Sequence, residues 1–132
     1  MIVNKSFMMV KTISYATHDL EYQISCLEKL KECTFNRILI PNFSYGVFEN
    51  VITIHMEYIK GQQIYPDKKK IYTNIVYEDL VCSTNPISAK GYALENFIIT
   101  KDKIYYIDLE DIAFCSVEER KEKFKKDWLD KR

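Results

Sequence analysis

The chain has 132 residues, enough for one domain with a buried core and too few for a multidomain enzyme. Basic and acidic residues are equal in number, 19 of each, which argues against binding nucleic acid through a broad basic surface. The three glycines, Gly46, Gly61 and Gly91, lie too far apart to form a glycine-rich phosphate-binding loop. Dinucleotide sites of the G-x-G-x-x-G type and Walker-type nucleotide sites are therefore excluded.

The cysteine and histidine pattern excludes the common zinc motifs. The chain has no Cys-x-x-Cys pair, and its only histidines are His18 and His55. No apolar run approaches the roughly 20 residues that span a bilayer, and the N-terminus lacks the apolar core of a signal peptide. We therefore expect an intracellular, cytoplasmic protein with reduced cysteines and no membrane partner.

The first half of the chain predicts a small sheet with one helix. Residues 1–13 indicate a short strand, a turn at positions 4–6 and a longer strand, whose alternation places Lys11 on an otherwise apolar face. A helix over residues 17–32 follows, and the helical spacing of its leucines and isoleucine predicts packing against a sheet. Two extended runs within residues 43–59 then predict a hairpin.

The second half predicts two helices separated by another hairpin. A connector with the lysine run 68–70 precedes a helix over residues 71–81, a hairpin over residues 96–108 and a charged helix that begins near Val117. The lysine run is more typical of a solvated connector than of a phosphate site. A narrow apolar stripe on the terminal helix predicts that one side of it docks. The stripe consists of Val117, Phe124 and Trp128.

The second hairpin brings an amide and a carboxylate into register. If its turn centres on Asp102, Asn96 and Asp108 lie directly opposite each other, with Cβ atoms about 5 Å apart. Amide and carboxylate oxygens suit Mg²⁺, which takes few protein ligands and fills its other positions with water and phosphate oxygens. The alternative is an ordinary strand pair with polar ends, and the geometry alone favours that simpler interpretation.

The sequence from Gly91 to Phe114, GYALENFIITKDKIYYIDLEDIAF, resembles the hairpin between the catalytic loop and the metal loop of protein-kinase-like phosphotransferases. In that resemblance Asn96 matches the metal-binding Asn, and Asp108 matches the metal-binding Asp. Glu110 stands where protein kinases have a glycine, which is similar to small-molecule kinases of the same fold. The resemblance implies a site for Mg²⁺ and ATP.

Upstream segments resemble the same family in the order that its fold requires. MMVKT is similar to the strand whose lysine holds the α- and β-phosphates, which would be Lys11, with Met9 above the adenine. VITIHMEYIKG is similar to the strand and hinge below the adenine. This implies Met56 as the gatekeeper residue. The hinge backbone would then comprise Glu57, Tyr58 and Ile59.

Two positions depart from the family pattern. Counting back from Asn96 places Gly91 where the family has its catalytic Asp. The helix that should supply an acidic partner for Lys11 has Gln23 at the matching position, and Glu21 is the nearest acidic candidate. The glycine-rich loop is absent, and we expect the helical half that binds a protein substrate to be missing. Loss of general-base assistance lowers a rate by about 10²–10⁴-fold.

The sequence thus predicts an α+β fold that resembles a miniature protein kinase, with a first lobe over residues 1–59 and a reduced second lobe over residues 60–132. The leading hypothesis is an ATP- and Mg²⁺-binding protein, with phosphotransferase activity left open. The alternative is an inactive pseudokinase that acts as an interaction or regulatory module, through a protein partner or a homodimer. A third hypothesis, binding of single-stranded nucleic acid by the ten tyrosines and seven phenylalanines, is disfavoured, because most of these aromatics fall at core-compatible positions.

Overall fold

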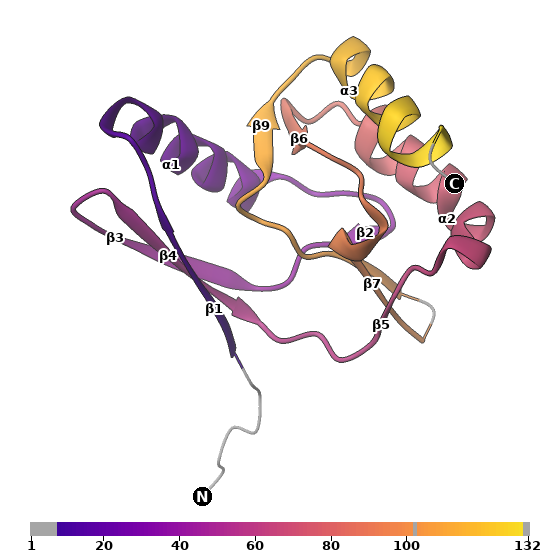
Figure 1. The fold of residues 1–132 in the computed structure, drawn as a ribbon, viewed down its shortest axis with the longest axis horizontal. Helices are drawn as coiled ribbons and strands as arrows, with labels where there is room; N and C mark the ends of the chain where they lie inside the picture. Colours follow the sequence, from indigo (N-terminus) through magenta and orange to yellow (C-terminus); the bar gives the residue numbers. More distant parts are fainter. Residues whose placement is uncertain (1–7, 102, 131–132) are drawn as a thin grey trace, which may run out of the picture.

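The computed structural model describes residues 8–101 and 103–130 and has a mixed α+β fold (Figure 1). The expected first strand and the turn at residues 4–6 lie outside the described residues. The regular elements are β1 (Met8–Ser14), α1 (Thr17–Glu32), β2 (Ile38–Leu39), β3 (Phe43–Phe48), β4 (Val51–Glu57), β5 (Gln62–Gln63), the 3₁₀ turn η1 (Pro66–Lys68), α2 (Lys69–Val76), the π turn η2 (Tyr77–Val81), β6 (Ile87–Ala89), the 3₁₀ turn η3 (Leu94–Asn96), β7 (Phe97–Thr100), β8 (Lys103–Tyr106), β9 (Ile112–Phe114), α3 (Val117–Phe124) and the π turn η4 (Lys125–Leu129).

The first sheet is antiparallel, with strand order β1-β4-β3. The predicted β3–β4 hairpin is confirmed, although β4 ends at Glu57. Its turn contains no glycine, and Glu49 adopts the positive φ of 55° instead. Alternation along β4 buries Ile52, Ile54 and Met56 on one face. Across the ladder, Lys11 pairs with Ile54, so its side chain lies on this buried face.

Helix α1 has the predicted bounds and packs against the β6–β9 pair, which lies between α1 and the helices α2 and α3 (Figure 1). Two of the four predicted stripe residues, Leu27 and Leu30, are fully buried. The buried face also includes Gln23 and Cys26, so it is rotated from the expected stripe. A hydrogen bond of 2.9 Å from the Phe114 N–H to the Tyr22 hydroxyl oxygen fixes the contact with β9.

The two halves of the chain share a second sheet, with strand order β2-β8-β7-β5. Its strand β2 comes from the first half and runs parallel to β8 from the second, with Ile38 paired to Ile104.

The predicted second helix begins earlier than residue 71, because the 3₁₀ turn that starts at Pro66 leads directly into Lys69. Across the described residues, no helix is both long and apolar enough to cross a membrane.

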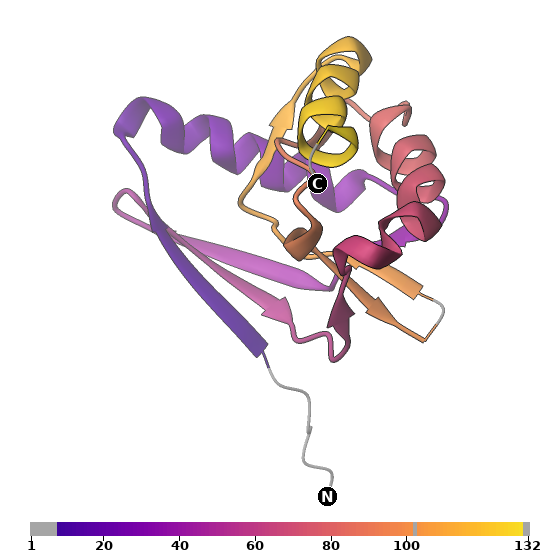
Figure 2. The same ribbon diagram turned by 45° about the vertical axis from the view of Figure 1, so that its right-hand side comes forward.

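The C-terminal helix docks on its aromatic side, as predicted. Ser116 begins α3 with a reciprocal capping box, in which its hydroxyl and the Glu119 carboxylate each accept a backbone N–H. Phe124 and Trp128 are at most 1% exposed and stack on each other. The Trp128 indole N–H donates to the Thr73 hydroxyl at 2.8 Å, which holds the end of this helix beside α2 (Figure 2).

Candidate functional site

Lys11 contacts two carboxylates from the opposite end of the chain. Its Nζ atom lies 2.8 Å from Glu110 Oε2 and 3.3 Å from Asp108 Oδ1. Strand β1 carries Lys11, and the turn between β8 and β9 carries both acids. A hydrogen bond of 2.9 Å from the Asp111 N–H to the Asp108 carbonyl tightens this turn. The three residues, called the Lys11 cluster below, join the first sheet to the second half of the protein.

The Lys11 cluster combines two carboxyl groups with one ammonium. Glu110 Oε1 is shielded from solvent and has no hydrogen-bond partner within the described part of the chain. Burial, reinforced by the neighbouring Glu110 carboxylate, raises the pKa of Asp108 to about 7. Burial opposes ionisation of Glu110 as well, but the contacts with Asp108 and Lys11 outweigh it and hold the Glu110 pKa below its usual value. Asp108 is therefore partly protonated near pH 7, so a further cation would bind here in exchange for that proton.

The acid that pairs with Lys11 is Glu110 rather than Glu21. Glu21 is exposed on α1 and forms no ion pair with Lys11 among the described residues, while Gln23 is buried. Burial lowers the pKa of Lys11, but the two carboxylates more than offset this and raise it overall. Sequence reasoning noted Glu110 only as a departure from a glycine. The feature that could have identified Glu110 is its position two residues after Asp108, in a turn that lies against β1 in the fold.

The register of the β7–β8 hairpin differs from the prediction by one residue. Phe97 pairs with Tyr106 and Thr100 with Lys103, so the hairpin turn has two residues instead of three. Beyond the strands, the Ile107 N–H donates to the Asn96 carbonyl at 2.9 Å. The expectation that Asn96 lies directly opposite Asp108 is therefore wrong.

Both residues still lie at the open end of this hairpin, Asn96 at the end of η3 and Asp108 two residues beyond β8. The residues that the structure describes contain no group of three or more His, Cys, Asp and Glu side chains that could hold a metal ion. A magnesium ion that arrives with a nucleotide needs fewer protein ligands, since water and phosphate oxygens complete its shell.

The predicted adenine-contacting residues lie beside Lys11 on the same sheet. Met9 and Met56 are cross-strand partners, and alternation puts Met9 on the same face as Lys11. Met56 is buried, whereas Tyr58 is exposed and Ile59 is half-buried after the end of β4.

Glu57 is bonded to the loop before β3. Its N–H donates to the Asn42 carbonyl at 2.8 Å, and its carboxylate accepts the Asn42 N–H at 3.1 Å. Of the predicted hinge, Tyr58 and Ile59 follow this anchored residue and lie outside the strand ladder.

Gly91 lies beside the segment that follows Asp108. It comes two residues after β6, which pairs with β9, and the neighbouring Lys90 N–H donates to the Asp111 carbonyl at 2.8 Å. The strand pair thus brings the chain around Gly91 next to the turn that carries the Lys11 cluster acids, although the two segments are distant in sequence.

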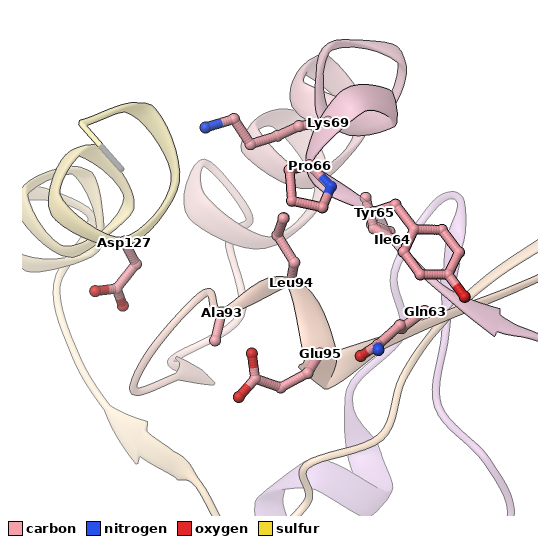
Figure 3. Close-up of a pocket in the computed structure, with 9 residues that line it drawn as sticks. All are labelled: Gln63, Ile64, Tyr65, Pro66, Lys69, Ala93, Leu94, Glu95 and Asp127. Atoms are coloured by element: carbon pink, nitrogen blue, oxygen red, sulfur yellow. The ribbon is translucent and has the colours of Figure 1, made fainter. Parts of the chain in front are cut away.

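A cavity of about 370 Å³ lies between the segment after β5, η3 and the C-terminal helix (Figure 3). It does not include Lys11 or Asp108, but Glu95 in its wall directly precedes Asn96. Lys69 also lines it and donates to the Trp128 carbonyl. Sequence reasoning missed this cavity, because its walls come from three separate segments. The lining residues are Gln63, Ile64, Tyr65, Pro66, Lys69, Ala93, Leu94, Glu95 and Asp127.

Neither a protein-family model nor a curated protein matches this chain.

Proposed function

We propose that this protein binds ATP together with Mg²⁺, in the manner of kinase-like phosphotransferases. The observation that carries the proposal is the contact of Lys11 with Asp108 and Glu110 across almost the whole chain. A lysine on one sheet facing acids on a turn suits a nucleotide, because the ammonium can hold phosphate oxygens while a carboxylate holds the metal. In this proposal Lys11 contacts the phosphates, and Asn96 and Asp108 bind Mg²⁺.

The residues of the Lys11 cluster fit a bound cation. One ammonium faces two carboxylates, and the buried Glu110 Oε1 has no hydrogen-bond partner in residues 8–101 and 103–130. A buried anionic oxygen without a partner is costly, so a divalent cation near Asp108 and Glu110 would stabilise the cluster. When bound, Mg²⁺ would neutralise phosphate charge and orient the γ-phosphate.

The adenine would lie against the same face of the first sheet. The half-buried Met9 lies beside Lys11 and pairs across the ladder with the buried Met56, and methionine side chains adapt well to an aromatic ring. The backbone of Glu57, Tyr58 and Ile59 would provide the polar contacts at the edge of the adenine. Because the Glu57 N–H already donates to the Asn42 carbonyl, the proposed contacts with the adenine come from the N–H groups of Tyr58 and Ile59.

Isothermal titration calorimetry with ATP and Mg²⁺ tests this function. We expect Lys11→Met and Asp108→Ala to weaken binding by about tenfold or more, since each loses a charge-assisted contact. Lys29→Met is the matched control, because Lys29 pairs with Glu32 on the outside of α1. Absence of heat with the wild type, or equal binding by all variants, would reject the proposal.

A second candidate function is an inactive pseudokinase that acts as an interaction or regulatory module. Two observations favour it: Gly91 stands where the resemblance expects a carboxylate, and the outer face of the first sheet exposes Met8, Val10 and Phe48. Light scattering separates the candidates, because this module should form a dimer or a complex. A monodisperse monomer that hydrolyses ATP would exclude it.

A further inference from the structure

The space beside Gly91 is filled by a carboxylate from the C-terminal helix. A Cβ atom added to Gly91 would lie 3.1 Å from Asp127 Oδ2 and 3.7 Å from Asp111 Oδ2. Gly91 does not have a positive φ, so its backbone conformation does not require glycine. What glycine provides at this position is room for the Asp127 carboxylate.

The position of Asp127 is fixed by the core. The Tyr92 N–H donates to Asp127 Oδ2 at 3.0 Å, and Lys123 Nζ lies 3.9 Å from Asp127 Oδ1. The next residue, Trp128, is fully buried against Phe97 and Phe124. Asp127 therefore sits on a rigid element, which a group that must be aimed at a reacting atom requires.

Asp127 also forms part of the cavity wall. Its side chain is 18% exposed and lines the cavity from the C-terminal helix, while Glu95 lines it from η3, before β7 (Figure 3). A cavity of about 370 Å³ is the size of a small-molecule site. Glu95 in its wall directly precedes Asn96. A Cβ atom on Gly91 would lie near both Asp127 and Asp111, and Asp111 closes the turn of Asp108.

We propose that Asp127 is the catalytic base that the chain lacks at position 91, and that the cavity binds a small hydroxyl-bearing phosphate acceptor. This inference rests on the proposed function. The Asp127 carboxylate accepts the hydroxyl proton while the acceptor oxygen forms a bond to the γ-phosphorus. The bond from the γ-phosphorus to the β–γ bridging oxygen breaks, and ADP leaves with the electron pair. Asp127 then returns the proton to solvent.

Hydrolysis of ATP measures this step without knowledge of the acceptor, since water can take its place. The experiment measures ADP formation from ATP and Mg²⁺, and the dissociation constant of ATP, for the wild type and Asp127→Asn. Asn keeps an oxygen for the Tyr92 N–H but cannot accept a proton. We expect ADP formation to fall by about 10²-fold or more, with ATP affinity unchanged. Asp130→Asn, an exposed change near the end of the same helix, is the control and should have no effect.

Moving the carboxylate back to position 91 provides the decisive variant. Asp127→Ala removes the side chain that a residue at position 91 would meet, so Gly91→Asp fits in that background. We expect the double variant to recover about tenfold of the rate that Asp127→Ala loses. If the Asp127 variants do not fold, Gly91→Ala decides instead. It would displace the Asp127 carboxylate and lower the rate by about tenfold.

The outcomes separate this inference from the proposed function. A wild type that binds ATP but forms no ADP overturns the role of Asp127 and leaves nucleotide binding intact. A rate unaffected by Asp127→Asn, or by Gly91→Ala where the Asp127 variants do not fold, also overturns that role. A wild type that does not bind ATP rejects the proposed function, and with it the site in which Asp127 would act.

Discussion

The Asp79 carboxylate is buried and the Lys11 cluster is partly buried, and the two differ in how their charge is satisfied. Asp79 is 6% exposed and accepts three backbone N–H groups, at distances of 2.6–2.9 Å, from the segment that leads into β2. These groups belong to Asn36, Arg37 and Ile38. The protein itself supplies every partner that this buried anion needs.

Like Asp79, Arg120 is a buried charged side chain that bonds to the backbone, but its charge is positive. It is 3% exposed, and its guanidinium donates mainly to backbone carbonyls around the end of η2 and the start of α3. In the Lys11 cluster, by contrast, two acids share one ammonium, and one buried carboxylate oxygen has no hydrogen-bond partner among the residues that the structure describes. The comparison distinguishes charged groups that hold the fold together from the charged groups that, in our proposal, bind a ligand.

Loss of the Asp79 carboxylate should have the largest effect on stability. Asp79→Ala leaves three N–H groups without an acceptor, and each unsatisfied buried group costs about 1–3 kcal/mol. We expect the free energy of unfolding to fall by about 3 kcal/mol or more in urea denaturation. Glu78→Ala is the matched control, because the Glu78 carboxylate pairs with Arg37 on the surface. Similar losses in the two variants would contradict the structural role of Asp79.

The Lys11 cluster should respond in the opposite direction. Asp108→Asn removes one of two repelling acids and leaves Glu110 to pair with Lys11. Because the Asp108 carboxyl is partly open to solvent, water screens the repulsion, and we expect a gain in stability of about 1–2 kcal/mol at pH 8. A loss of stability at pH 8 would show that Asp108 is structural, like Asp79.

The pH dependence of this gain follows from the raised pKa of Asp108. The folded protein holds the Asp108 proton more tightly than the unfolded chain does, so protonation favours folding. That contribution is complete below about pH 4 and is lost as the pH rises through about 7. The advantage of Asp108→Asn should therefore shrink steadily from pH 8 towards pH 4 in thermal unfolding, whereas Asp130→Asn should show no such trend.

The sequence predicted the elements better than it predicted their register. Helix α1, the β3–β4 hairpin and the docked terminal helix follow from apolar periodicity, which is a local property. The register of β7–β8 depends on the turn. That turn has no glycine or proline, so the sequence does not distinguish a two-residue turn from a three-residue turn. In the structure, Lys101 adopts a positive φ of 54° there.

The candidate site was predictable only in part, for a related reason. Lys11 was found because a charged residue on an apolar strand face is unusual, and Asp108 because of its motif. The contact with Glu110 depends on how β1 meets a turn far along the chain, which no local pattern encodes. Asp127 gave no signal either, since its place beside Gly91 is set by the docking of Trp128.

The smallest expected effect is the response to Mg²⁺ without nucleotide, which should involve the Lys11 cluster and not Asp79. A cation that binds the folded protein alone stabilises it by RT ln(1 + [L]/Kd), which is about 1 kcal/mol at 10 mM for a Kd of about 2 mM. We expect a rise in the unfolding midpoint of about this size at pH 8. Near pH 5 the rise should disappear, since the proton on Asp108 competes with the metal.

A change in the Lys11 cluster and a change elsewhere in the fold should have different effects on the stabilisation by Mg²⁺. Asp108→Asn should abolish the stabilisation by Mg²⁺, because one of the two cluster carboxylates is gone and Lys11 neutralises the other. A variant weakened elsewhere, such as Ser116→Ala at the start of α3, should be stabilised by Mg²⁺ as much as the wild type is. An equal response in the wild type and Asp108→Asn would mean that the metal binds another part of the surface.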